Sequence, residues 1–198
     1  MKRIAVLISG DGSNLQALID AAASRQLAAE IVVVVANTLD AFGLTRAEKA
    51  GIPTEVLELR SVLADGGDRT AFDIELAVSV AGYSPDLVVL AGWMLIVGTD
   101  FLDHFPGQVI NIHPALPGTF PGTDAIRRAH VAFGEGTINE TGVMVHHVIP
   151  EVDAGPVIVS ESVALRHEDT LDELEARIHA VEHRLLVDAV GCVLQEMG

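Results

Sequence analysis

The chain has 198 residues and a formal net charge of −16, because 28 aspartates and glutamates outnumber twelve lysines and arginines. That balance excludes a basic surface for nucleic acid or for an anionic membrane, so we expect small-molecule substrates. With 49% hydrophobic but only 4% aromatic residues, the sequence predicts one domain over residues 1–198 with a core of Val, Ile, Leu and Ala.

The single cysteine and the N-terminal residues bear on location. Cys192 lies in an apolar helical run, which predicts a buried, unreactive thiol, and one cysteine excludes an internal disulfide. Lys2 and Arg3 precede an apolar run that is too short for a secretory signal or a membrane span. We therefore expect a cytoplasmic protein, either a monomer or a homodimer.

The first elements are a strand, a glycine-rich turn and a helix. The apolar run Ile4–Ile8 leads into Ser9–Asn14, and a helical pattern begins at Leu15. In such a turn the backbone N–H groups and the positive end of the helix face an anion, most often a phosphate. The alternative is that the glycines only allow the chain to turn and that the turn binds no ligand.

A dinucleotide site is not expected at this turn. Leu15 stands where the Rossmann fingerprint has its third glycine. The second strand, Ile31–Ala36, ends at Asn37 instead of at an acidic residue suited to a ribose. We therefore do not expect NAD to bind at this turn.

The middle of the chain alternates helices and strands. In order, the patterns predict a helix over Ala41–Ala50, a strand over Thr54–Leu59, a polar loop over Ser61–Asp68, a helix over Arg69–Ala81 and a strand over Leu87–Ala91. Arg69 opens a helix, where a cation is disfavoured, so it is either a ligand contact or a solvated arginine. The apolar segment Trp93–Val97 lines a pocket for a flat ligand or belongs to the core.

The segment Val109–Leu116 carries the main candidate site. Side chains alternate across a strand, so Asn111 and His113 project from the same face. Pro114 favours an extended backbone at His113 and helps to end the strand, which leaves the imidazole at an edge. This is typical of an active site, with a buried structural Asn/His pair as the alternative.

The last third predicts an antiparallel edge and a long helix. A loop over Pro117–Gly122 precedes a helix from about Asp124, and two strands over Thr141–Ile149 and Pro156–Val163 flank a loop that carries Asp153. A capping box at Thr170 opens the closing helix. The order of elements predicts an α/β fold: a Rossmann-like, mostly parallel sheet with helices on both faces and an antiparallel C-terminal edge.

No metal site is expected. The stretch His179–His183 fits an H-x-x-E-H pattern, but only fifteen residues follow it and they lie on the same helix, so no further ligand can reach the ion. His146 and His147 point to opposite faces of a strand, so at most one of them can join His113.

Three motifs then suggest a family: Gly10–Gln16, Asn111–Pro114 and Val152–Pro156 occur in that order. With them the chain resembles, over nearly its whole length, the phosphoribosylglycinamide formyltransferases, folate-dependent enzymes of purine synthesis. The resemblance implies transfer of a formyl group from 10-formyltetrahydrofolate, as co-substrate, to the amine of 5-phosphoribosylglycinamide.

The resemblance also implies residue roles. It implies that the ribotide phosphate and ribose bind at Gly12, Ser13, Asn14, Leu15, Gln16 and Glu182. It implies folate contacts at Arg69, Met94, Leu95, Ile96, Val97 and Asn111. It implies catalysis by Asn111, His113 and Asp153, with His146 as a further polar group near the formyl carbon.

The sequence departs from the usual bacterial pattern at three places. Leu95 replaces an arginine, a tolerable change if this segment holds the pterin through backbone groups. The loop Leu116–Phe120 resembles the fungal form of the enzyme, and Asp124 replaces a frequent histidine. None of these changes touches the three residues implied in catalysis.

From the chemistry, Asn111 and His113 are expected to stabilise the oxyanion of a tetrahedral intermediate, while Asp153 raises the pKa of His113 and orients its ring. Three alternatives remain. A methionyl-tRNA formyltransferase would need an RNA-binding extension and a positive surface. A non-catalytic protein that binds a phosphorylated sugar would not need Asn111, His113 and Asp153 together. A hydrolase with Ser13 as the nucleophile would need the G-x-S-x-G motif, which the sequence lacks at Ser13.

Overall fold

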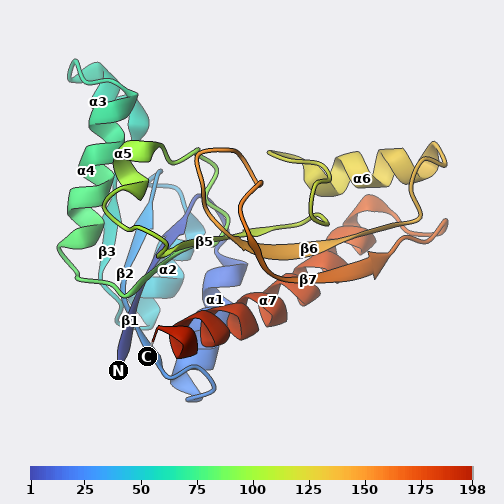
Figure 1. Ribbon diagram of the computed structural model, residues 1–198, viewed down its shortest axis with the longest axis horizontal. Helices are drawn as coiled ribbons and strands as arrows, with labels where there is room; N and C mark the ends of the chain where they lie inside the picture. The colour runs from blue at the N-terminus through green and yellow to red at the C-terminus, as the bar shows by residue number, and fades with distance from the viewer. Residues whose placement is uncertain (198) are drawn as a thin grey trace.

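Seven strands form one sheet, in the order β3-β2-β1-β4-β5-β6-β7, in the computed structural model, which describes residues 1–197 (Figure 1). The strands are β1 (Lys2–Ile8), β2 (Ala29–Ala36), β3 (Thr54–Val56), β4 (Leu87–Leu90), β5 (Val109–His113), β6 (Glu140–His147) and β7 (Val157–Ala164). The helices are α1 (Ser13–Ala23), α2 (Phe42–Lys49), α3 (Leu59–Ala64), α4 (Arg69–Ala81), α5 (Thr99–Leu102), α6 (Ala125–Gly134) and α7 (Leu171–Glu196).

The sheet is parallel from β3 to β5 and antiparallel at β6 and β7. The central strands are apolar and buried on both faces, as parallel strands between two layers of helices must be. The predicted mostly parallel sheet with an antiparallel C-terminal edge is therefore confirmed.

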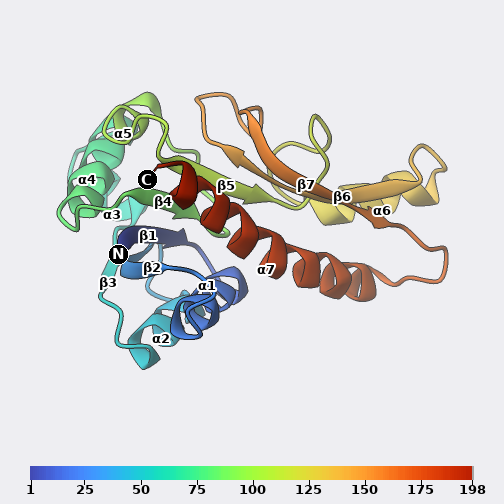
Figure 2. The same cartoon turned by 60° about the horizontal axis from the view of Figure 1, so that its bottom comes forward.

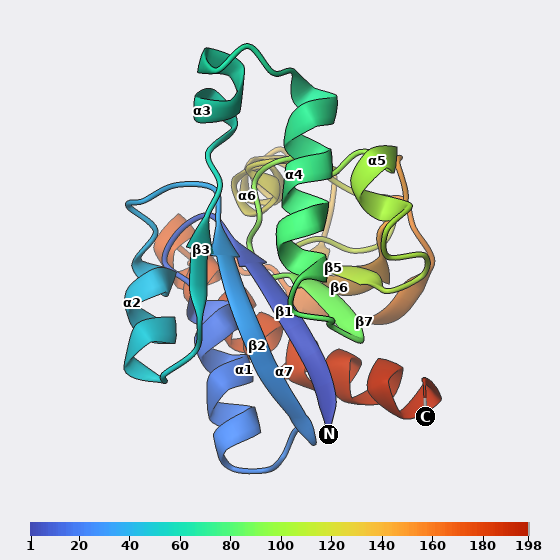
Figure 3. The same ribbon diagram turned by 90° about the vertical axis from the view of Figure 1, so that its left-hand side faces the viewer.

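Helices cover both faces of the sheet (Figure 3), and an apolar cluster of side chains fills the space on each face. On one face, Leu15 and Leu18 of α1 and Ile178 of α7 pack with every second residue of the strands. On the other face, Phe72 and Leu76 of α4 pack with the alternate residues. The period-2 alternation of the strands thus divides one apolar sequence between two cores.

Helix α7 runs along the sheet between α1 and α6 and contacts β6 and β7 (Figure 2). Its capping box forms as predicted: the Thr170 hydroxyl accepts from the backbone N–H of Glu173 at 3.3 Å, and the Glu173 carboxylate accepts from the Thr170 N–H at 2.8 Å. Leu174, Ile178 and Leu185 lie on its buried face, and so does the polar residue Glu182.

The strand order places a topological switch point between β1 and β4. The chain leaves β1 toward β2 on one side, whereas β4 and β5 lie on the other side. In open α/β sheets, ligands bind outside the carboxyl ends of the strands at such a point. Gly10, Gly92 and Pro114 all follow the carboxyl ends of strands that meet there.

Three predictions about local structure were wrong. The strand expected over Thr54–Leu59 ends at Val56. Helix α3 begins at Leu59, the last residue of that expected strand, and extends into the expected polar loop, because Leu59 and Val62 pack against the core through one helical turn. The short α5 was not predicted. Cys192 is exposed instead of buried, because the inward face of α7 is taken by Val193 and Leu194.

Within residues 1–197, none of the helices combines the length and the apolar character that a membrane crossing requires.

Candidate active site

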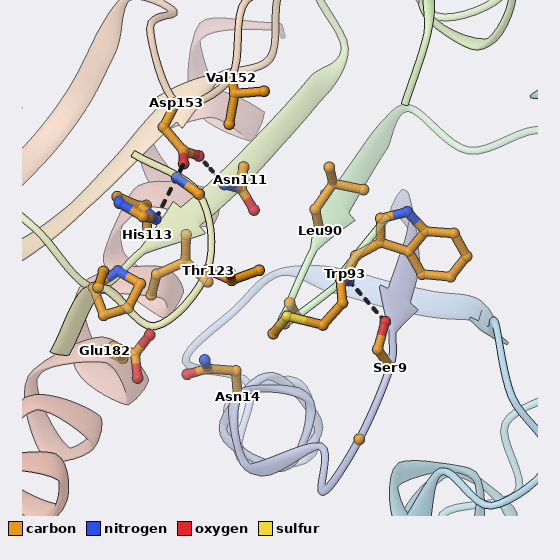
Figure 4. Close-up of a pocket in the computed structure, with 18 of the residues that line it drawn as sticks. Ser9, Asn14, Leu90, Trp93, Asn111, His113, Thr123, Val152, Asp153 and Glu182 are labelled. Carbon is orange, nitrogen blue, oxygen red and sulfur yellow. Dashed lines mark hydrogen bonds and ion pairs between the residues drawn. The ribbon is translucent and has the colours of Figure 1, made fainter. Parts of the chain in front are cut away.

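A cavity of about 1050 Å³ opens at the switch point. Its walls come from parts of the chain that are far apart in sequence: the turn after β1, the segment after β4, the end of β5 with the facing part of β6, the start of α6, the loop between β6 and β7, and α7. This size and the mixture of apolar and polar walls are typical of a site for small organic molecules. Figure 4 shows its polar side chains facing one another across the opening.

The turn at the first wall leads directly into the N-terminus of α1. Gly12 is the N-cap residue with φ +76°, and no side chain caps the helix. The first backbone N–H groups of α1 therefore remain available to an anion, with the helix dipole in support. Asn14 is 92% buried, and its Oδ1 has no hydrogen-bond partner within residues 1–197.

Gly12 is required for two separate reasons. A side chain at φ +76° is strained, and a Cβ at this position would lie 2.7 Å from the Cα of Gly43 in α2. The Gly43 N–H in turn donates to the Gly10 carbonyl at 3.1 Å. The turn is thus held against α2 by backbone contacts.

Arg46 fixes the same turn from α2. Its Nε donates to the Asp11 carbonyl at 2.9 Å, Nη2 contacts the Asp11 carboxylate at 3.0 Å, and Nη1 donates to the Gln16 Oε1 at 3.3 Å. Sequence reasoning missed this residue, since nothing in its helical position distinguished it from a surface arginine.

The apolar wall is formed by Met94–Val97. Trp93 and Val97 are buried in the second core, while Met94 and Ile96 are 64% and 61% exposed. The two interpretations of this segment therefore apply to different residues: Trp93 and Val97 belong to the core, whereas Met94 and Ile96 form the exposed part of the pocket wall. The Met94 N–H donates to Ser9 Oγ at 2.8 Å, which ties this wall to the glycine-rich turn.

Asn111 and His113 lie on the same face of β5, as the alternation predicted, and both line the cavity. His146 of β6 is the direct cross-strand partner of Asn111, so its ring joins that face, and it is 98% buried. The prediction that at most one of His146 and His147 can join the site is consistent with this pairing.

Asp153 contacts these three side chains from the loop between β6 and β7. Its Oδ1 accepts from Asn111 Nδ2 at 3.2 Å and lies 3.5 Å from His146 Nε2, while Oδ2 lies 3.4 Å from His113 Nδ1. Figure 4 draws its links to Asn111 and His113. Oδ2 also accepts from the Gly122 N–H at 2.8 Å. Asp153 has φ +52°, an unusual conformation for a non-glycine residue that often marks functional sites.

The ring nitrogens of His113 have distinct roles. Nε2 lies 3.0 Å from the carbonyl oxygen of Phe120, which can only accept, so Nε2 carries a hydrogen. In the neutral ring the lone pair is then on Nδ1, the atom that faces Asp153. The His146 ring has the opposite orientation: its Nδ1 donates to the His147 carbonyl at 2.9 Å, and its Nε2 lies 3.3 Å from Asn111 Nδ2 and 3.5 Å from Asp153 Oδ1.

Burial lowers the pKa of His113 below its ordinary value, although Asp153 and the Phe120 carbonyl oppose that shift. The expected contribution of Asp153 is present, but the expected net rise is wrong because desolvation of the imidazolium is larger. For Asp153, burial raises the pKa, but hydrogen bonds from His146 and Gly122 outweigh it, so the pKa is lowered overall. The site therefore favours a neutral imidazole beside a carboxylate.

Glu182 lines the wall formed by α7 and is 96% buried. His179 Nδ1 lies 2.6 Å from its Oε2, and this hydrogen bond raises the pKa of His179. The H-x-x-E-H pattern thus serves a histidine–glutamate pair on one helix face. Within residues 1–197, no group of three His, Cys, Asp or Glu side chains is arranged to hold a metal ion.

Three of the predicted binding residues lie outside the cavity wall. Leu15 is fully buried in the core, and the Gln16 amide is held by Arg46 and Asp20. Arg69 pairs with Asp73 at 3.2 Å, and Asp73 accepts from the Gly98 N–H at 3.0 Å, directly after the apolar wall. The remaining predicted residues line one cavity: Gly12, Ser13, Asn14, Met94, Leu95, Ile96, Val97, Asn111, His113, His146, Asp153 and Glu182.

Comparisons with known proteins show the family to which the chain belongs. A family described as formyl transferase matches residues 2–190, and the chain belongs to that family. A phosphoribosylglycinamide formyltransferase of Dictyostelium discoideum is 46% identical over 94% of this chain and 95% of its own length, and one of Schizosaccharomyces pombe is 43% identical over 98% and 97%.

Within that family the chain falls among the phosphoribosylglycinamide formyltransferases, as its three motifs predicted. The crystal structure of phosphoribosylglycinamide formyltransferase from Bacillus halodurans has the same fold. Its TM-score is 0.91 at 34% identity, and the match covers 100% of this chain and 97% of that one.

Proposed function

We propose that the protein transfers the formyl group of 10-formyltetrahydrofolate to the amine of 5-phosphoribosylglycinamide, a step of purine biosynthesis. One observation carries the proposal: a turn suited to a phosphate and a cluster of Asn111, His113 and Asp153 line the same cavity. The named relatives act as formyltransferases on this ribotide, and they match nearly the whole chain.

The two substrates would occupy different ends of the cavity. The ribotide phosphate fits the backbone N–H groups at the start of α1, from Gly12 to Asn14, and its ribose hydroxyls fit the buried carboxylate of Glu182. The flat folate fits the apolar wall at Met94–Val97. The reacting amine and formyl carbon then meet at the carboxyl end of β5.

The chemistry requires one C–N bond to form, the C–N10 bond to break and one proton to pass from the amine to N10. Neutral His113 accepts the amine proton at Nδ1, and the resulting imidazolium lies beside the oxyanion, with Asp153 at 3.4 Å to stabilise it. The same ring then delivers the proton to N10, so the atoms and charges balance.

Asn111 acts on the carbonyl oxygen of the formyl group. Nδ2 faces Asp153 at 3.2 Å, and Figure 4 shows the amide oxygen on the cavity side. The NH2 group carries two hydrogens, and we propose that Nδ2 keeps one on Asp153 and donates the other to the developing oxyanion. Such a donor contributes about 10²- to 10³-fold to the rate.

We also propose that residues 1–198 form one catalytic domain that works in the cytoplasm, as a monomer or a homodimer, on small-molecule substrates alone. The single sheet supports one domain, and the charge of −16 supports the exclusion of nucleic acid.

A direct assay tests the proposal. The purified chain is given the ribotide with 10-formyltetrahydrofolate and, separately, with formate and ATP, and the His113→Ala protein serves as the matched control. We expect the formylated ribotide with the folate donor only, and formation on the order of 10²-fold slower or more with the control. Product with formate and ATP alone would contradict the folate donor, and binding of the ribotide without any turnover would favour a non-catalytic binder.

A further inference from the structure

Phe120 occupies an unusual place beside the catalytic cluster. It has φ +47°, a left-handed conformation that costs about 1–2 kcal/mol for a residue with a Cβ. Its carbonyl oxygen accepts from His113 Nε2 at 3.0 Å, and two residues later the Gly122 N–H donates to Asp153. The loop Pro117–Gly122 therefore contacts both members of the His113–Asp153 pair through its backbone.

Arg128 of α6 holds this loop. A single nitrogen, Nη2, donates to the carbonyl oxygens of both Phe120 and Pro121, at 2.6 and 2.7 Å. The guanidinium carbon lies 5.8 Å from the centre of the Phe120 ring. Arg128 is the fourth residue of α6, near a helix N-terminus, where a cation is disfavoured unless other contacts compensate.

The two donors on Phe120 use both lone pairs of one carbonyl oxygen. Arg128 fixes where that oxygen lies, and the oxygen in turn decides which ring nitrogen of His113 keeps its hydrogen. If the carbonyl moved away, neutral His113 would place its hydrogen on Nδ1, facing the Asp153 carboxylate at 3.4 Å. The ring would then lack a free lone pair on the side of the cavity.

We propose that Arg128 is a positioning residue, which holds the Phe120 carbonyl against His113 Nε2 and thereby keeps the Nδ1 lone pair of His113 available for the amine proton. The inference rests on the proposed formyl transfer for its consequence in turnover, but the state of the His113 ring is a property of the free protein. Arg128 also acts through its charge: beside Asp153 and His146, it is the third charged or titratable group that faces His113, and it lowers the pKa of His113.

The test replaces Arg128 by methionine, with Arg25→Met as the matched control. Arg25 is exposed, and its side chain forms no hydrogen bond within residues 1–197, so the control removes the same charge elsewhere. Ring-nitrogen chemical shifts of the 15N-labelled histidines, assigned to His113 with the His113→Ala protein, report which nitrogen carries the hydrogen.

For Arg128→Met we expect His113 to lose its fixed Nε2–H form and kcat to fall on the order of 10-fold or more, because a small displacement of a reacting group lowers the rate steeply. Both KM values should stay within about 3-fold, since Arg128 acts on the loop and not on the bound molecules. The acidic limb of the kcat–pH profile should move to higher pH, because a cation near His113 has been removed.

Arg128→Lys keeps the charge but lacks the planar guanidinium. If circular dichroism shows that the methionine variant does not fold, the same measurements are made on Arg128→Lys instead. We expect a lowered kcat and a disturbed His113 ring with a smaller shift of the pH limb.

A native ring form and a native kcat in both variants would overturn the proposal, and so would a change in KM alone. Loss of the Nε2–H form in a protein without any formyl transfer would contradict the proposed function and support the role of Arg128.

Discussion

The two ends of the cavity are built in different ways. At the turn end, which is the turn Ser9–Asn14, the groups proposed to bind the phosphate are backbone N–H groups of α1, held by Gly12 against Gly43 and by Arg46. At the end proposed to be catalytic, called the catalytic end, the groups are side chains from two strands and a loop, joined through Asp153. A backbone site tolerates side-chain changes that leave its geometry intact, whereas each polar side chain at the catalytic end has no substitute.

The largest expected effect lies at the catalytic end. His113→Ala and Asn111→Ala should each lower kcat by on the order of 10²-fold or more, because each removes a group that acts on the reacting atoms. Circular dichroism and thermal unfolding should show a folded protein in both cases. Near-native turnover in either variant would remove that residue from the mechanism and weaken the contrast between the two ends.

Asp153→Asn should lower kcat by between about 10-fold and 100-fold, because the imidazolium that forms in the reaction loses its carboxylate partner. In the folded protein Asp153 raises the pKa of His113 against the larger effect of burial. Its loss should lower that pKa further. Because the proposed mechanism uses neutral His113, the acidic limb of the kcat–pH profile should move to lower pH. A limb that stays in place would show that Asp153 does not act through His113.

Gly12→Ala should mainly affect the turn end. The new Cβ lies 2.7 Å from Gly43 Cα at φ +76°, so we expect a loss of about 1–2 kcal/mol in the free energy of unfolding. The turn must shift to accommodate it, which should raise KM for the ribotide by about 10-fold with little change in kcat. Gly10→Ala is the control for stability, since its Cβ meets nothing within 4 Å. A change confined to kcat would mean that the turn serves the reaction and not the binding.

Ser13→Ala should have the smallest effect. It removes a hydroxyl but leaves the backbone N–H at the start of α1, so KM for the ribotide should change less than about 3-fold. Steady-state kinetics over a range of ribotide concentrations measure it. A much larger rise would show that side chains, and not the backbone, hold the anion, and the contrast between the two ends would fail.

The order of the elements in the fold, and the shared face of Asn111 and His113, could be predicted from local sequence patterns. Asn111 and His113 share a face because strands alternate, and the switch point follows from the order of apolar runs and helices. Resemblance, and not pattern, identified Asp153 and Glu182. What the sequence could not predict depends on contacts between distant segments: Arg128 on Phe120, Arg46 on Asp11 and the tie from Ser9 to Met94.

The direction in which the pKa of His113 shifts also could not be predicted from the sequence. A carboxylate partner in the motif predicts a rise, but the sum depends on how completely the ring is removed from water, and His113 is 96% buried. The failed strand at Leu57–Leu59 has a similar cause, since one apolar run suits a strand or a helical turn and packing with α4 decides between them.

The hydrogen bond from the Gly122 N–H to Asp153 joins two loops that each contain a residue at positive φ, Phe120 and Asp153. Strain on both sides of one bond favours separation of the loops without unfolding of the sheet. The Gly122 amide should then exchange its hydrogen for deuterium through local opening, far sooner than the amides of β5. Its exchange rate, measured without substrate and with each substrate, would report how often the two loops separate and which substrate holds them together.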